Sequence, residues 1–302
     1  MLIDAGANKP HPQKIIYIVS SKLSGSTLLD LMLDRHSLVE SLGEIISLDR
    51  WLTQNWLCSC SRPLADCDYW KEILKAARHS ANQEVVGTIP DSRRRLWRYW
   101  WPDKETARRY GQRSLDLFGA VWHVTGRPVI VDSSKSLPRL KLLHLSGMFD
   151  LRVVHLIRDG RGHLHSQLRK RPPPVAKNLR NKKHGRARTV LSWVVYNRLI
   201  ARTLRQMPDV KWLRIRYEDL AADPESKLTE ICRFADLWFE PKMTVPTTLG
   251  IHNIAGNQWR FDSKAEIPIV LDENWRTGLS TSDALIFELL AGRYNRSLGY
   301  YH

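Results

Sequence analysis

Four short apolar segments, each followed by a cluster of polar residues, constrain the fold of this chain more than any other feature. They are residues 14–20, 128–131, 151–157 and 210–215. Helical patterns lie between them, and strands that alternate with helices predict a parallel sheet covered on both faces. We therefore expect an α/β fold in which residues 1–302 form a single domain around a central parallel sheet flanked by helices.

The polar clusters occupy equivalent positions after the four predicted strands. They cover residues 20–27, 132–135, 158–160 and 216–219. In open parallel sheets, ligands bind at the carboxyl ends of the strands, which all lie at the same edge. The four clusters therefore predict one shared binding site.

The cluster after the first strand is a loop of small polar residues that leads directly into a helical pattern. Its sequence, SSKLSGST over residues 20–27, resembles the nucleotide loop Gly-x4-Gly-Lys-Ser/Thr. Gly25 and Thr27 fit that frame, whereas Ser26 stands where a lysine would reach the β- and γ-phosphates. The loop predicts an anion site in a P-loop-like three-layer sandwich, and it argues against hydrolysis of ATP or GTP.

Basic residues dominate the charge of the chain, with a formal net charge of +16. This excess favours anionic partners such as nucleotides, acidic glycans or a membrane surface. Residues 169–188 are strongly basic and contain no acidic residue, so we expect a mobile loop that acts as a lid or an acceptor clamp. Residues 93–101 mix cations with aromatic rings, which suits either an amphipathic helix or a surface that stacks a sugar or an aromatic acceptor.

The start of the chain carries no apolar segment typical of a signal peptide. Residues 1–13 are polar and contain Pro10 and Pro12, which predicts a flexible N-terminus. No apolar run approaches the length of a membrane span. We expect a cytoplasmic protein.

Three of the four cysteines, Cys58, Cys60 and Cys67, lie close together in the sequence. Three thiols could begin a zinc site, but no fourth ligand lies near them in the chain. A local disulfide or buried reduced thiols are therefore the expectation, and no residue is assigned to a metal. Cys232 lies in an apolar helical pattern typical of a core.

Two segments resemble the signatures of the sulfotransferase family, above all its bacterial members and, less closely, the enzymes that act on protein tyrosine. The loop from Lys22 to Thr27 is similar to the family's 5′-phosphosulfate loop. The run from Leu156 to Ser166 is similar to its 3′-phosphate motif, in which a strand ends in an arginine and a serine follows eight positions later. That spacing lets both side chains reach one phosphate, because the serine lies two turns into the next helix.

Further segments extend the resemblance over nearly the whole chain: residues 131–135, 216–220 and 256–260. The resemblance implies that the donor is 3′-phosphoadenosine 5′-phosphosulfate, with the adenosine bisphosphate as product and without a metal. The residues it assigns to the donor are Lys22, Leu23, Ser24, Gly25, Ser26, Thr27, Arg158, Ser166, Tyr217, Gly256, Asn257 and Arg260. The chain departs from the family at Leu23, where the family has a basic residue; Lys22 lies one step upstream.

Catalysis of sulfuryl transfer by in-line attack depends on cations and a base more than on covalent catalysis by the enzyme. Lys22 and Lys135 are the candidate cations. The resemblance implies a glutamate base after the first helix, and Glu44, preceded by glycine, is preferred to the nearby Glu40. A histidine is the base in small-molecule relatives, and His252 is the strongest rival, ahead of His123 and His155.

The acceptor is a hydroxyl or an amine of a small molecule, a glycan or a lipid headgroup; the sequence does not distinguish these. Two other functions stay open at this point. A P-loop kinase for a small molecule would need a lysine at position 26 and a magnesium-binding aspartate. A polyanion- or nucleic-acid-binding protein would account for the basic loop but not for the polar clusters at four strand ends.

Overall fold

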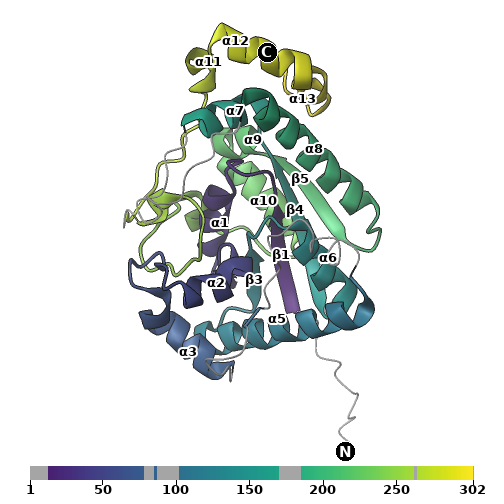
Figure 1. The fold of residues 1–302 in the computed structure, drawn as a ribbon. Helices are drawn as coiled ribbons and strands as arrows, with labels where there is room; N and C mark the ends of the chain where they lie inside the picture. Colours follow the sequence, from purple (N-terminus) through teal and green to yellow (C-terminus); the bar gives the residue numbers. More distant parts are fainter. Residues whose placement is uncertain (1–12, 78–84, 87–101, 170–184, 262–263, 302) are drawn as a thin grey trace, which may run out of the picture.

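The computed structural model describes residues 13–77, 85–86, 102–169, 185–261 and 264–301 (Figure 1). These residues form a five-stranded sheet in which every pairing is parallel and the strand order is β2-β3-β1-β4-β5. The strands are β1 (Gln13–Val19), β2 (Val39–Ser41), β3 (Val129–Asp132), β4 (Phe149–Ile157) and β5 (Lys211–Arg216). The predicted α/β fold is confirmed. The short strand β2 was not expected, because three residues give too short a pattern to recognise.

The described helices lie between and after the strands, and a single π-helical turn at residues 288–292 joins the last two. They are α1 (Ser26–Asp34), α2 (Leu48–Thr53), α3 (Asp68–Ala76), α5 (Lys104–Thr125), α6 (Leu137–Ser146), α7 (Gly160–Arg169), α8 (Arg186–Arg205), α9 (Tyr217–Ala222), α10 (Pro224–Phe234), α11 (Trp275–Gly278), α12 (Thr281–Phe287) and α13 (Arg293–Ser297). In the part of the chain that the structure describes, no helix combines the length and apolar character needed to cross a bilayer.

Strand β1 is buried on both faces, which explains why its sequence is continuously apolar. Ile15 and Tyr17 pack into a core shared with α5 and α6, whereas Ile16 and Ile18 pack into a second core shared with α1 and α10 (Figure 1). Successive side chains of a strand point to opposite faces, so one apolar run can supply both cores. The two cores produce the three-layer arrangement.

Two predicted boundaries need correction. Gln13, expected at the end of the flexible N-terminus, belongs to β1 and pairs with Phe149 in the sheet. Of the segment 169–188, expected to form a basic loop, Arg169 lies in α7 and residues 186–188 lie in α8. Arg186 is the first residue of α8 and forms an ion pair with the buried Asp283 of α12. Residues 170–184 and 87–101 lie outside the described residues.

A buried ion pair shapes the backbone after β3. The Arg139 Nε donates to the Asp132 carboxylate at 2.7 Å, and neither side chain is exposed to solvent. The same carboxylate accepts from the backbone N–H of Ser134 at 3.0 Å, and the guanidinium also donates to the Tyr110 hydroxyl at 2.6 Å. Asp132 thus supports the turn that leads to Lys135.

We expect Asp132→Asn to lower the free energy of unfolding by about 3–5 kcal/mol, because it leaves the buried Arg139 charge without its partner. Chemical denaturation monitored by circular dichroism measures this loss. The matched control is Asp68→Asn, which breaks an exposed ion pair with Arg62 and should cost about 1 kcal/mol or less. Equal losses of unfolding free energy in the two variants would contradict the stabilising role of the Asp132–Arg139 ion pair.

Candidate active site

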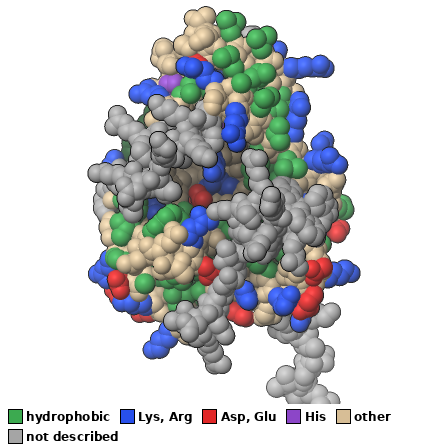
Figure 2. Space-filling view, in the orientation of Figure 1, with side chains coloured by type: hydrophobic (Ala, Val, Ile, Leu, Met, Phe, Trp, Pro, Cys, Tyr) green, Lys and Arg blue, Asp and Glu red, His purple; other side chains and the backbone are tan. Residues whose placement is uncertain are grey.

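The register of the sheet aligns the carboxyl ends of β1, β3, β4 and β5. Tyr17 pairs with Asp132, Val19 with His155, and Ile157 with Arg216. The polar clusters that follow β1, β3, β4 and β5 therefore leave the sheet at one edge. Figure 2 shows basic and acidic side chains beside one another in a hollow on one face of the molecule.

The loop after β1 adopts a conformation that turns its backbone tightly. Leu23 and Gly25 both have left-handed backbone angles, with φ of 61° and 85°. Gly25 directly precedes α1, and a Cβ at this position would lie 2.4 Å from the Tyr217 ring. Two features therefore require glycine at position 25: the left-handed backbone conformation and the close approach of the Tyr217 ring. This geometry brings Tyr217, one of the residues predicted to bind the donor, against the predicted phosphate loop.

Arg158 is the central side chain of this edge. It is buried, and its Nη1 donates to the Leu23 carbonyl at 3.0 Å and to the Ser166 hydroxyl at 3.3 Å. Its guanidinium lies 4.8 Å from the centre of the Tyr217 ring. The arginine and serine of the predicted 3′-phosphate motif thus meet beside the loop, in agreement with the resemblance.

Two residues that the sequence analysis did not single out hold this arrangement. Asp272 accepts from the Arg158 Nη2 at 2.7 Å. His163 is buried, and its Nδ1 lies 2.8 Å from the Lys22 carbonyl, so Nδ1 must carry the proton that is donated. Burial lowers the pKa of His163 to about 4, which keeps the ring neutral at pH 7. The Lys22 side chain itself is exposed.

The late loop around Gly256 lies against the start of α1. The Asn257 N–H donates to the Thr27 hydroxyl at 3.3 Å, and Gly256 has a φ of 98°. Arg260 is buried and donates to the carbonyls of Asn253, Ala255 and Leu57. Burial lowers the pKa of Arg260 to about 10, so the guanidinium stays charged at neutral pH. Its contacts connect the loop to the segment before Cys58.

The predicted base and one predicted cation form an ion pair. The Lys135 Nζ lies 2.8 Å from the Glu44 Oε1, and both side chains are partly exposed. Glu44 is positioned by its own backbone, whose N–H donates to the Ile254 carbonyl at 2.8 Å. Lys135 has a left-handed φ of 59°, and Tyr196 donates to its carbonyl at 2.5 Å. The residues predicted to act as base and cation therefore face each other.

A buried carboxyl group of α1, that of Asp30, lies near this ion pair. Asp30 accepts from the Asn253 amide at 2.6 Å, and that amide also donates to the Ser41 hydroxyl at 3.2 Å. Burial raises the pKa of Asp30 to about 7. The carboxyl is therefore largely neutral below that pH, and it then adds little negative charge next to a loop expected to bind an anion.

The two rival bases have other partners. Glu40 lies in β2, where it accepts from Arg127 at 3.0 Å and from the Tyr69 hydroxyl at 2.6 Å. His252 lies against the three clustered cysteines, with its Nδ1 3.2 Å from the Cys67 sulfur. No residue near these cysteines in the sequence could complete a metal site, but the fold brings His252 beside them from 185 residues away.

Comparison with known proteins agrees with this arrangement. The sulfotransferase family matches residues 16–241, which is most of the chain. This chain belongs to the sulfotransferase family. Comparison with curated proteins gives no match.

Two solved structures show the same fold as this sulfotransferase. The sulfotransferase domain from the Synechococcus PCC 7002 olefin synthase is 20% identical, with a TM-score of 0.53 over 96% of both chains. The sulfotransferase domain from the curacin biosynthetic pathway is 19% identical, with a TM-score of 0.54 over 96% of this chain and 98% of the other.

The structure of this sulfotransferase brings most of the predicted donor residues together. Arg158, Ser166, Tyr217, Asn257 and the loop ending at Thr27 are connected by the contacts described above. Among the residues that were missed, His163 carries a sequence signal, because it lies one turn before Ser166 in the same motif. Asp272 carries none, since it reaches Arg158 from 114 residues away.

Proposed function

We propose that this sulfotransferase transfers a sulfuryl group from 3′-phosphoadenosine 5′-phosphosulfate to a hydroxyl or amine acceptor. The observation that carries the proposal is the position of Arg158, which contacts both the phosphate-type loop at Leu23 and the Ser166 hydroxyl. A buried arginine at a strand end, next to a loop at a helix N-terminus, suits a ligand with two separate anionic groups. A nucleotide with a 3′-phosphate and a 5′-phosphosulfate has that chemistry.

The loop from Lys22 to Thr27 would hold the 5′-phosphosulfate, with backbone N–H groups and hydroxyls as donors. Arg158 and Ser166 would bind the 3′-phosphate, and Asp272 would give up its contact with Arg158 or share it. Arg260 has a different role in our proposal: its guanidinium is occupied by backbone carbonyls, so it would support the Gly256 loop rather than bind phosphate.

In the transfer step the acceptor oxygen or nitrogen attacks sulfur while the bond from sulfur to the 5′-phosphate oxygen breaks. The acceptor proton passes to Glu44, and the adenosine 3′,5′-bisphosphate leaves with the electron pair of the broken bond. Lys135, 2.8 Å from Glu44, is the cation that would stabilise charge on the sulfuryl and bridging oxygens. The ion pair supports this assignment because it holds the two side chains beside each other.

Isothermal titration calorimetry with adenosine 3′,5′-bisphosphate and with AMP tests the donor assignment. We expect the bisphosphate to bind about 30- to 1,000-fold more tightly, since only it offers a 3′-phosphate to Arg158. Equal affinity for the two nucleotides would refute the 3′-phosphate assignment. A transfer assay with labelled donor over several acceptor classes then identifies the acceptor, and phosphate transfer from ATP that depends on Mg²⁺ would indicate a kinase instead.

A further inference from the structure

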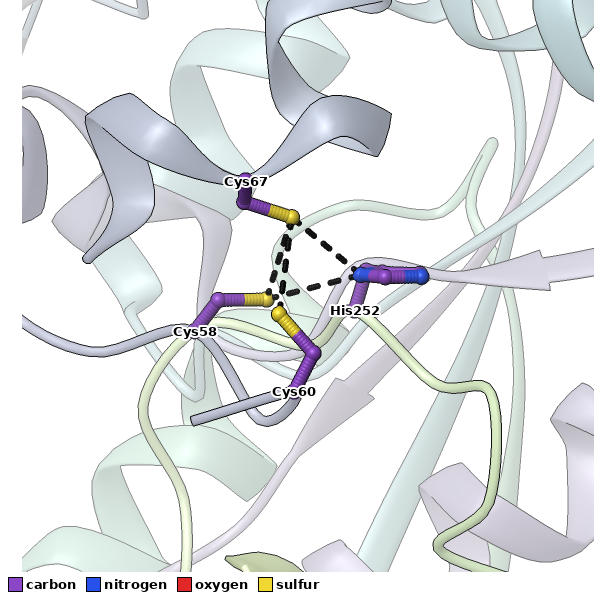
Figure 3. A group of neighbouring side chains, drawn as sticks. All are labelled: Cys58, Cys60, Cys67 and His252. Carbon is purple, nitrogen blue, oxygen red and sulfur yellow. Dashed lines mark hydrogen bonds between the residues drawn. The ribbon is translucent and has the colours of Figure 1, made fainter. Parts of the chain in front are cut away.

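Three cysteines and one histidine converge at a point that the transfer reaction does not use (Figure 3). The ligand atoms are the sulfurs of Cys58, Cys60 and Cys67 and the Nδ1 of His252, and all four lie within 4.8 Å of one another. Cys58 and Cys67 are fully buried, whereas Cys60 and His252 are partly exposed. All three thiols are free.

Four of the six separations between these atoms are close to those of a tetrahedral metal site. Cys67 lies 3.6 Å from Cys60 and 3.8 Å from Cys58, measured between sulfurs. The His252 Nδ1 lies 3.2 Å from the Cys67 sulfur and 3.8 Å from the Cys58 sulfur. Bond lengths of about 2.3 Å to sulfur and about 2.0 Å to nitrogen, at tetrahedral angles, place two sulfurs about 3.8 Å apart and sulfur and nitrogen about 3.5 Å apart.

The surrounding residues fix the two segments that carry the ligands. The Ser59 hydroxyl donates to the Ile251 carbonyl at 2.7 Å and accepts from the Asn253 N–H at 2.9 Å, so it binds the backbone on both sides of His252. Trp70 donates to the His252 carbonyl at 2.9 Å. The Tyr69 ring stacks on the imidazole, with ring centres 4.6 Å apart. The imidazole is therefore held in one orientation toward the sulfurs.

A positive charge lies close to this cluster. Three thiolates and a neutral imidazole around Zn²⁺ carry a net charge of −1. Arg260 donates to the Leu57 carbonyl, next to Cys58, and to the Asn253 carbonyl, next to His252. Its guanidinium therefore links the same two segments and would offset that charge.

We propose that Cys58, Cys60, Cys67 and His252 bind one zinc ion as a structural Cys₃His site. Thiolate and imidazole ligands at tetrahedral separations select zinc among the common divalent cations, and four protein ligands leave no open position for catalysis. The site clamps the segment 251–257, whose Ile254 carbonyl accepts from the Glu44 N–H and whose Asn257 contacts Thr27. With Nδ1 bound to the metal, His252 has no lone pair left to act as the general base. The proposal does not depend on the identity of the sulfuryl donor.

Metal content measured on the full chain, purified with a reductant, tests the site without any activity assay. We expect about one zinc per chain, and replacement by Co²⁺ should give the intense visible bands of tetrahedral cobalt bound to thiolate. Cys58→Ser and His252→Gln should reduce bound zinc at least tenfold. The matched control is Cys232→Ser, a buried cysteine packed against Met243, which should keep one zinc per chain.

The wild-type measurements decide the proposal even if a variant fails to fold. A chain that contains no zinc when purified, and takes up neither Zn²⁺ nor Co²⁺ when reduced, would overturn it. So would a disulfide between any two of the three cysteines, detected by mass spectrometry of the unreduced protein. An unchanged cobalt spectrum in folded His252→Gln would remove the histidine from the site and overturn the Cys₃His assignment.

Discussion

Glu44→Gln should lower turnover by about 10²–10⁴-fold while donor binding persists, because the substitution removes a general base and keeps the shape of the side chain. In the proposed mechanism Glu44 contacts the acceptor and not the nucleotide, so the affinity for adenosine 3′,5′-bisphosphate should hardly change. Initial rates with the acceptor identified by screening, together with calorimetry of the bisphosphate, separate the two effects.

Glu40→Gln is the matched control, since the sequence offers Glu40 as the alternative base. In the structure its carboxylate is occupied by Arg127 and Tyr69. The folded Glu40→Gln protein should therefore keep its turnover. If Glu44→Gln retained normal turnover and Glu40→Gln lost it, the assignment would be reversed; if both retained it, the acceptor would need no base.

Arg158→Ala should weaken binding of adenosine 3′,5′-bisphosphate by about 2–4 kcal/mol, roughly 30- to 1,000-fold, through loss of a buried charge-assisted contact. Titration calorimetry on the folded variant measures the loss. Ser166→Ala should cost less, about 0.5–1.5 kcal/mol, because it removes one neutral hydrogen-bond donor. Both variants alter the same contact, which is 3.3 Å long in the free protein.

AMP, which lacks the 3′-phosphate, is the control for an indirect effect of Arg158→Ala on the phosphate loop. Arg158 also donates to the Leu23 carbonyl, so its removal could disturb the phosphate loop and weaken every nucleotide. If Arg158 binds the 3′-phosphate, Arg158→Ala should reduce the affinity for the bisphosphate far more than the affinity for AMP. Equal losses would mean that Arg158 acts through the loop, and the 3′-phosphate would need another partner.

The sequence predicted those elements of the fold whose residue pattern lies within one short segment. Residues 14–20 predict β1 to within one residue at each end, because a strand buried on both faces needs a continuous apolar run. The loop before α1 was equally recognisable, since its glycine and small hydroxyl residues allow a tight turn at a helix N-terminus. The strand β2 escaped prediction because its three residues give too short a pattern to recognise.

The candidate site likewise combines features that a local pattern predicts with contacts that it does not predict. The resemblance to the family's 3′-phosphate motif implied that Arg158 and Ser166 reach one phosphate, and the strand and helix patterns placed the two residues on neighbouring elements. The sequence by itself therefore determined the phosphate-type loop and the family resemblance, and the resemblance supplied the Arg158–Ser166 pair. Only the tertiary structure decided the partners of Glu44, of Arg158 at Asp272, and of the three cysteines at His252. Those contacts join segments from 91 to 194 residues apart, and no local pattern records which distant segment a fold brings near.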